Sequence, residues 1–135
     1  MDIVILGCGR VGALVASELS PQHSVTVVDW SDGAFQRLAP EFAGRTVTGN
    51  GIDVDVLKAA GAAEADMFFA LMDADNQNLM ASQVALQLGA RQAVARVYDP
   101  VRAEAFRKLG LRTISPTVTG ARRLFDMIVG PGEVE

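Results

Sequence analysis

Residues 1–30 read MDIVILGCGRVGALVASELSPQHSVTVVDW and contain the strongest structural signal in the sequence. An apolar run over residues 3–6 is followed by glycines at the spacing G-x-G-x-x-G, namely Gly7, Gly9 and Gly12. A helix-type segment follows, and then a second apolar run that ends on Asp29. A strand, a glycine turn, a helix and a second strand ending on an acid are the parts that hold a dinucleotide or an adenine nucleotide.

Each glycine of this motif has a separate physical task. Gly7 makes the tight turn after the strand, Gly9 lets a phosphate approach the backbone, and Gly12 lets the helix pack close to the strand. The N-terminus of that helix presents free N–H groups and a partial positive charge to the phosphates. Cys8 and Val11 occupy x positions of the loop, and Cys8 can contact a ligand only through its backbone.

Asp29 lies 22 residues beyond Gly7, at the tip of the second predicted strand. A carboxylate in this place can accept both ribose hydroxyls and repels the 2′-phosphate of NADP. The alternative is that Asp29 caps a short helix that begins near Ser31. Trp30, the only tryptophan, either flanks the adenine edge or covers the margin of the sheet.

Size and hydropathy indicate one domain. The chain has 135 residues, half of them hydrophobic, but no apolar run approaches the ~20 residues that span a bilayer. No basic region precedes the first apolar run, so we expect no signal peptide and no direct membrane insertion. One cysteine excludes an internal disulfide and fits a reducing compartment, so we expect a cytoplasmic protein.

Charge argues against a nucleic-acid partner. The formal net charge is −4, whereas proteins that bind nucleic acids usually present a basic face. A local basic cluster between residues 102 and 112 is interrupted by Glu104 and preceded by Asp99. We interpret that cluster as a solvated helix face.

Strand-type and helix-type segments alternate along the chain. Strands are expected near residues 3–6, 25–29, 46–48, 67–70, 93–96 and 112–115. Helices are expected near residues 10–19, 32–38, 54–60, 75–88, 100–110 and 117–129. Asp53 and Asp99 are candidate N-caps, and Gly61 is a candidate stop.

This alternation predicts an α/β fold with a Rossmann-like, doubly wound parallel sheet of six strands in the order 3-2-1-4-5-6 and helices on both faces. The ligand crevice should lie between the loops that follow Leu6 and Ala70. We expect one nucleotide-binding domain over residues 1–129 and a linker-like tail over residues 130–135.

Four stretches resemble a known family. They are GCGRVG (7–12), TGNGIDVDVLKAAGA (48–62), ADMFFALMDADNQNLMASQVA (65–85) and ARVYDPVRAEAFRKLGLRTISP (95–116). In this order they resemble the N-terminal domain of the regulator-of-K⁺-conductance family, also called RCK, KTN or TrkA-N, found in Trk and Ktr potassium uptake systems. Asn50 stands where that family more often has aspartate, and Met72 stands where it commonly has a small or hydroxyl residue.

The resemblance implies a regulatory nucleotide site without catalysis. Its ligand would be NAD(H), with ATP/ADP or AMP as alternatives. Relatives form dimers, often assembled into octameric rings, on the cytosolic face of an integral-membrane K⁺ channel or transporter. The expected function is therefore ligand-dependent gating of potassium transport, with the protein cytoplasmic or peripheral at the inner face of the membrane. The alternatives are a small NAD-dependent oxidoreductase or a ligand-free scaffold.

The family pattern also extends the candidate site. Arg10 opens the first helix, where a cation opposes the helix dipole unless a phosphate offsets it, and the resemblance implies a phosphate-sensing role across a subunit boundary. Asn50 and Gly51 belong to a turn that can meet adenine, although Asn-Gly is also an ordinary turn pair. The loop after the fourth strand adds Leu71, Met72 and Asp73.

Two further polar residues are candidates. Asn78 could reach the far end of the ligand, although Asp75 and Asn78 are also spaced as a helix cap and its third position, which is more typical of capping than of a metal site. Arg96 should point to the same crevice and pair with a phosphate or with Asp73. The expected helix over 117–129 has an apolar stripe that either serves a partner subunit or packs on its own sheet.

Overall fold

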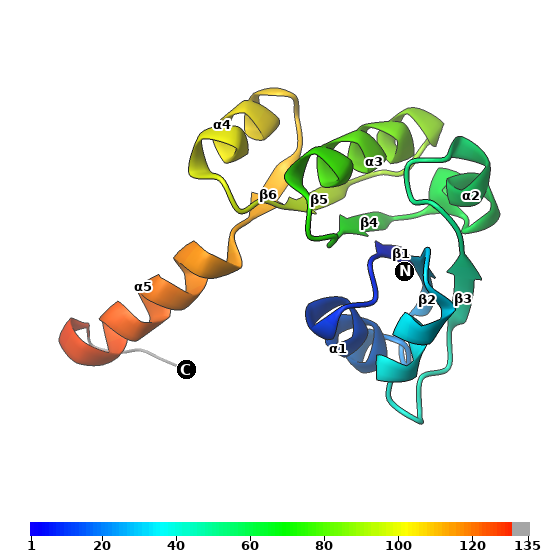
Figure 1. The fold of residues 1–135 in the computed structure, drawn as a ribbon, viewed down its shortest axis with the longest axis horizontal. Helices are drawn as coiled ribbons and strands as arrows, with labels where there is room; N and C mark the ends of the chain where they lie inside the picture. The colour runs from blue at the N-terminus through cyan, green and yellow to red at the C-terminus, as the bar shows by residue number, and fades with distance from the viewer. Residues whose placement is uncertain (131–135) are drawn as a thin grey trace.

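The computed structural model describes residues 1–130, so residues 131–135 of the expected tail lie outside the described residues. The strands form one parallel sheet of six in the order β3-β2-β1-β4-β5-β6, whose arrangement can be followed in Figure 1. The strands are β1 (Asp2–Leu6), β2 (Ser24–Asp29), β3 (Arg45–Thr48), β4 (Met67–Ala70), β5 (Ala93–Arg96) and β6 (Arg112–Ile114). The predicted fold class and strand order are confirmed.

Helical segments connect the strands. They are α1 (Arg10–Leu19), η1 (Asp32–Arg37), α2 (Val54–Ala59), η2 (Ala62–Glu64), α3 (Asp75–Leu88), α4 (Pro100–Lys108) and α5 (Pro116–Val129). Asp53 caps α2 and Asp99 caps α4 through their side chains, as predicted. Gly61 follows α2 with a φ of +89°, which a residue without a Cβ adopts at little cost.

The segment after β2 differs from the expected helix. Residues 32–38 were expected to be a regular helix, but Asp32–Arg37 forms a 3₁₀ helix of six residues. Gly33 near its start and Pro40 soon after its end leave too few residues to repeat α-helical hydrogen bonds. This tight turn positions Arg37 close to the glycine loop.

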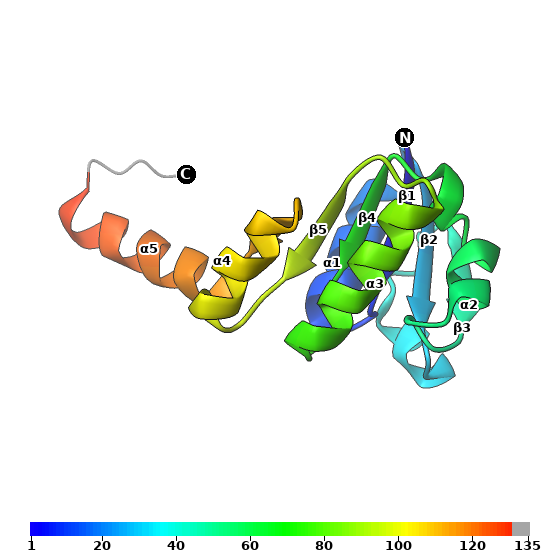
Figure 2. The same ribbon diagram turned by 90° about the horizontal axis from the view of Figure 1, so that it is seen from above.

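Two apolar layers cover the sheet. One joins Leu57 of α2, Ala81 and Ala85 of α3 and Phe106 of α4 to the inner strands. The other joins Ala13 and Ala16 of α1 and Ala34 of η1 to β1 and β2. Figure 2 shows α3 and α2 on one side of the strands and α1 behind them. Strands covered on both faces need apolar side chains in both directions, which explains the continuous runs in the sequence.

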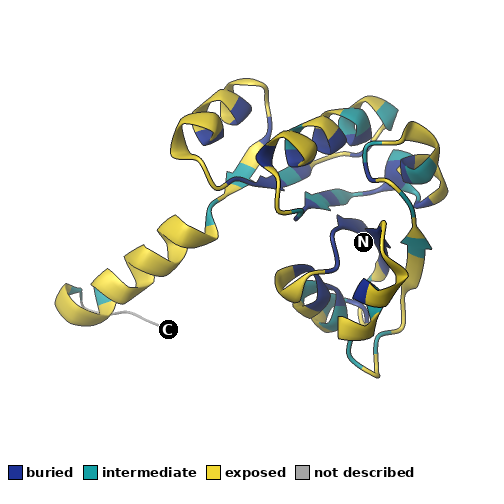
Figure 3. Cartoon of the chain, in the orientation of Figure 1, coloured by how far each residue is buried: buried dark blue, intermediate teal, exposed yellow. Residues whose placement is uncertain are grey.

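Helix α5 stands apart from both layers. In Figure 3 it projects away from the sheet, and none of its residues is buried. Ser115 caps its N-terminus by accepting a hydrogen bond from the Val118 N–H, and Pro116 occupies its first turn. The alternative that this helix packs on its own sheet is therefore wrong for the described structure.

The backbone of α1 packs very closely against the turn that follows β1. Gly7 has a φ of +106°, and a Cβ on Gly12 would lie 1.9 Å from the Gly7 carbonyl oxygen. No side chain fits at that separation, so the tasks predicted for the first and third glycines of the G-x-G-x-x-G motif, the tight turn and the close helix packing, are both seen in the structure. This contact brings the first turn of α1 to the end of β1.

A Gly12→Ala substitution should lower the free energy of unfolding by about 1–3 kcal/mol or more, because the methyl group forces α1 away from β1. Chemical denaturation followed by circular dichroism measures the change. Gly120→Ala in α5 is the matched control, since a Cβ there meets no atom within 4 Å and alanine favours a helix. Equal stability of wild type and Gly12→Ala would contradict the packing argument.

Candidate nucleotide site

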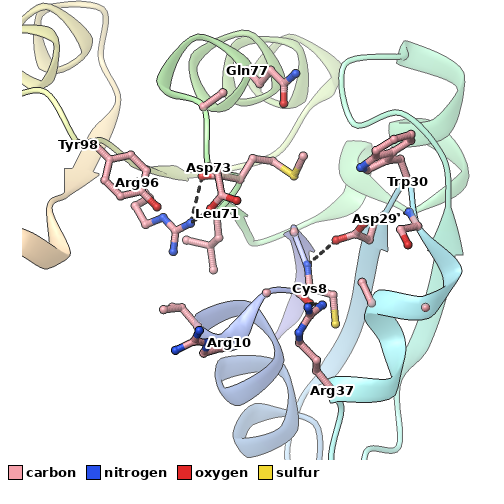
Figure 4. A pocket seen from close by; sticks show the side chains of 18 residues that line it. Cys8, Arg10, Asp29, Trp30, Arg37, Leu71, Asp73, Gln77, Arg96 and Tyr98 are labelled. Atoms are coloured by element: carbon pink, nitrogen blue, oxygen red, sulfur yellow. Dashed lines mark hydrogen bonds and ion pairs between the residues drawn. The ribbon is translucent and has the colours of Figure 1, made fainter.

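The carboxyl ends of the central strands meet at one edge of the sheet. Leu6 of β1 is in register with Val28 of β2 and with Ala70 of β4, so the loops after all three strands begin at the same level. These loops surround a cavity of about 750 Å³ (Figure 4). Its lining is Gly7, Cys8, Gly9, Arg10, Val11, Asp29, Trp30, Ser31, Gly33, Ala34, Arg37, Leu71, Met72, Asp73, Ala74, Gln77, Arg96 and Tyr98. A crevice where the strand order reverses is the ligand position of doubly wound folds.

Asp29 connects the glycine loop to the end of β2. Its carboxylate accepts a hydrogen bond from the Cys8 N–H at 2.8 Å and another from the Ser31 N–H at 3.0 Å. The side chain is largely buried but borders the cavity. Each carboxylate oxygen of Asp29 thus accepts one backbone N–H, one in the glycine loop and one in the turn after β2. The N-cap of η1 is Ser31, so the alternative that Asp29 caps this helix is wrong, and ribose binding stays a prediction.

The glycines differ in what they accommodate. A Cβ on Gly9 would meet nothing within 4 Å, so Gly9 leaves open space at the start of α1. A phosphate can use such space against free N–H groups. Gly12 does not line the cavity and serves the packing of α1. This arrangement fits an adenine nucleotide or dinucleotide, since the cradle is open where the phosphates belong.

A second hollow of about 330 Å³ adjoins the Trp30 side of the cavity. It is lined by Leu6, Trp30, Gly49, Asn50, Gly51, Ile52, Met72 and Gln77. The Asn50 side chain accepts a hydrogen bond from the Ile52 N–H, which closes the turn and leaves the amide nitrogen available. A Cβ on Gly51 would lie 2.2 Å from the Leu6 side chain. Gly51 is therefore required by packing on Leu6, and contact of this turn with adenine stays a prediction.

The opposite end of the cavity is polar. Arg96 donates a hydrogen bond to Asp73 at 3.0 Å and another to the Met72 carbonyl at 3.2 Å. Its guanidinium carbon lies 5.1 Å from the centroid of the Tyr98 ring. Arg96 is buried, with its Nε lacking a partner, while the Asp73 side chain is almost fully exposed. The predicted pair with Asp73 is present.

Asn78 does not reach the cavity. Its side chain is fully buried, accepts a hydrogen bond from the Met72 N–H at 2.8 Å, and donates to the carbonyls of Met72 and Arg96. The expected contact with the far end of the ligand is replaced by a structural one. Asn78 joins the loop after β4 to the end of β5 and thereby positions two residues that do line the site.

The predicted capping role of Asp75 is also wrong. The residue before α3 is Ala74, and Asp75 is the first helical residue. Its buried carboxylate accepts hydrogen bonds from the N–H groups of Tyr98 and Asp99. The sequence spacing could not reveal this role, because the partners lie more than 20 residues further along the chain. The contact holds the loop after β5 against the start of α3.

Sequence reasoning missed several cavity residues. Arg37 reaches from η1 to the Cys8 carbonyl with a 3.2 Å hydrogen bond. Gln77 lines both hollows from the exposed side of α3, and Tyr98 closes the polar end. In the sequence, the only hint of this role is that Arg37 follows closely after Asp29. The tight turn of η1 is what brings the Arg37 guanidinium to the Cys8 carbonyl.

Cys8 has a chemically quiet side chain. Burial, reinforced by the negative charge of Asp29, raises the pKa of the Cys8 thiol above its ordinary value, and Arg37 partly opposes the shift. The thiol is therefore protonated near neutral pH and unreactive. Within residues 1–130, no group of three or more His, Cys, Asp or Glu side chains is arranged to hold a metal ion.

The fold and the cavity define a class: a Rossmann-like domain with a ligand crevice at the carboxyl edge of its sheet. Residues 3–116 match the family model of the TrkA-N domain. The chain belongs to the TrkA-N domain family. A Trk system potassium uptake protein TrkA from Streptomyces coelicolor is 46% identical over 134 residues, which cover 98% of this chain and 60% of the relative. The chain thus spans less than two thirds of that relative's length.

Solved structures share the fold. The TrkA-N domain of the inner membrane protein ybaL from Escherichia coli superposes with a TM-score of 0.84 at 18% identity, covering 94% of this chain and 96% of that one. The Shewanella denitrificans Kef CTD in its AMP-bound form gives 0.77 at 23% identity over 98% and 84% of the two chains. The GsuK channel bound to NAD gives 0.71 at 24% identity over 85% and 21%.

Asn78→Ala should lower the free energy of unfolding by about 1–3 kcal/mol, because the Met72 N–H and two carbonyls lose a buried partner. Gln77→Ala, one residue earlier on the exposed side of α3, should change it by no more than about 0.5 kcal/mol. Denaturant unfolding of both variants tests the assignment. If Asn78→Ala were as stable as Gln77→Ala, Asn78 would not be the brace described above.

Proposed function

We propose that this chain is the nucleotide-sensing domain of a regulator of potassium uptake. The main support is the open space at Gly9, which is bordered by the Asp29 carboxylate and the N-terminus of α1. Membership of the TrkA-N family and the name of the Streptomyces coelicolor relative support the potassium-transport context. The membrane component of such a system is an integral K⁺ channel or transporter.

The cavity divides into parts that suit different pieces of a ligand. Asp29 would hold the adenosine ribose, with Trp30 and Asn50 beside the adenine. Gly9 and Arg10 would face the phosphates at the start of α1. The part of a ligand that extends beyond the phosphates would face Asp73, Arg96 and Tyr98.

NAD(H) is the preferred ligand, with ATP/ADP or AMP as alternatives. A dinucleotide would use both ends of the crevice, since polar groups lie at its Asp29 end and at its Asp73 end. The NAD-bound GsuK channel and the AMP-bound Kef CTD support both ligand classes for domains of this fold. Asp29 disfavours NADP, because its charge repels a 2′-phosphate.

Regulation requires a second body that ligand binding can move. Helix α5 supplies an apolar stripe with Val118, Leu124, Phe125 and Ile128 exposed. Such a surface, which no residue within 1–130 buries, suits a second copy of the chain. Different nucleotides would then bind two arrangements of the pair with different affinity, which is the condition for gating. A regulator of this kind would lie in the cytoplasm beside its membrane partner. No helix within residues 1–130 is long and apolar enough to cross a bilayer.

A regulatory role is preferred over catalysis. The Asp73 end of the cavity offers Arg96 and Tyr98, and Arg96 is engaged with Asp73 and the Met72 carbonyl. The single histidine, His23, lies before β2 at the opposite end of the strands from the crevice. Steady oxidation of NADH with any small carbonyl substrate would instead favour the oxidoreductase alternative.

A thermal-shift panel of NAD⁺, NADH, ATP, ADP, AMP and NADPH tests the ligand. A nucleotide at 100 times its Kd should stabilise the fold by about 2.7 kcal/mol. Asp29→Asn should abolish that shift, because it removes the charge that holds the ribose while keeping an acceptor for the Cys8 N–H. Asp66→Asn, at the opposite end of the sheet, is the control and should preserve the shift. No shift with any nucleotide would refute the proposed function.

Pairing through α5 has its own test. Replacing Phe125 and Ile128 together by glutamate should convert a dimer to a monomer in sedimentation velocity, because buried charge opposes association. The unfolding free energy of the monomer should not fall, since neither side chain is buried in the described structure. Arg122→Glu, on the polar side of α5, is the control. A dimer that survives the double substitution would exclude this surface.

A further inference from the structure

Two arginines flank the N-terminus of α1. Arg10 and Arg37 both line the main cavity, and both also line a shallow groove along the outside of α1 with Ala13, Leu14, Ser17 and Ala39. Residues that line both hollows stand at the rim between them. Figure 4 shows Arg10 at the start of α1, with Arg37 directed at Cys8 from the other side.

Arg37 and Asp29 contact the same loop residue from different sides. The Cys8 N–H donates to Asp29 at 2.8 Å, while the Cys8 carbonyl accepts from Arg37 at 3.2 Å. Gly9, the next residue, leaves the open space at the start of α1. Arg37 therefore contacts the loop residue that is bonded to Asp29 and that directly precedes the open space at Gly9.

The charges of the cavity favour an anion near Arg37. Three arginines and two aspartates line it, so this crevice is net positive in a chain whose net charge is −4. Arg96 is matched by Asp73 at 3.0 Å. Within residues 1–130, neither Arg10 nor Arg37 has a carboxylate oxygen within 4.0 Å. The ion pairs of these residues are instead formed by Arg91, Arg96 and Arg102.

The Arg37 side chain also has hydrogen-bonding capacity to spare. A guanidinium has five N–H donors, and the bond to Cys8 uses one of them. That bond is with a neutral carbonyl, which is a weaker partner than a phosphate oxygen. Because Arg37 is exposed on η1, its head can move toward a phosphate with little repacking.

We propose that Arg37 is a specificity-determining ligand of the phosphate next to adenosine. It would make the site select phosphorylated adenosine over adenosine itself, while Asp29 selects the ribose. This inference rests on the proposed nucleotide function and adds a residue from η1 to it. The groove outside α1 gives the guanidinium room to withdraw when the phosphate leaves.

The test compares ADP with adenosine. Trp30 is the only tryptophan and lines both hollows, so its fluorescence reports binding of either compound without a label. Arg37→Ala should weaken ADP binding by about tenfold, a typical loss for one charge-assisted hydrogen bond. The Kd for adenosine should stay within about twofold, because adenosine has no phosphate to lose. Arg37→Lys, which keeps the charge but loses the planar fork, should lie between the wild type and Arg37→Ala.

The control is Arg91→Ala, which removes an exposed arginine paired with Asp66 outside the cavity and should leave both affinities unchanged. An equal loss for ADP and adenosine in Arg37→Ala would overturn the proposal, because Arg37 would then act only by bracing the glycine loop. Unchanged ADP binding would overturn it as well, while leaving the nucleotide function intact. If wild type bound neither compound, the role of Arg37 would be refuted, whereas the proposed function would fail only if NAD⁺ and NADH gave no thermal shift either.

Discussion

The contact between Gly12 and the Gly7 carbonyl is the constraint on which the site depends. A Cβ at residue 12 would lie 1.9 Å from that oxygen, so only glycine lets α1 start immediately beside the end of β1. Once α1 starts there, its N-terminal N–H groups face the crevice between β1 and β4. The open position at Gly9 and the reach of Asp29 to the Cys8 N–H both follow from this placement.

A second set of contacts fixes the opposite wall. Buried Asn78 binds both the loop after β4 and the end of β5, and buried Asp75 binds the N–H groups of Tyr98 and Asp99. Both side chains contribute to the site without contacting a ligand, because they position Arg96 and Tyr98 at the cavity. The wall is thus built from hydrogen bonds between buried side chains of α3 and the backbone of the segments that follow β4 and end β5, while the exposed Asp73 carboxylate pairs with Arg96 at its surface.

The sheet with its covering helices and the C-terminal helix α5 differ in how much of their apolar surface is buried. The sheet and its covering helices bury their apolar residues within one chain, whereas α5 buries none of its own. A candidate ligand site at the centre and an exposed apolar helix at the end are the two elements that the proposed nucleotide-controlled assembly requires. Because they lie apart, substitutions can test the proposed nucleotide binding and the proposed pairing independently.

The amino-acid sequence was sufficient to predict the strand order, the glycine loop, the position of Asp29 at the end of β2 and the caps at Asp53 and Asp99. These features depend on local spacing and on the rules of chain connection. The tertiary structure alone decided the roles of Asp75, Asn78, Gly51 and Arg37. Each of these residues acts on a partner distant in the chain: Asp75 on the loop after β5, Asn78 on Arg96, Gly51 on Leu6 and Arg37 on Cys8. Local periodicity carries no information about such partners. It likewise predicted the apolar stripe of α5 but not its exposure, because a stripe reads the same whether the surface that covers it belongs to its own sheet or lies outside the chain.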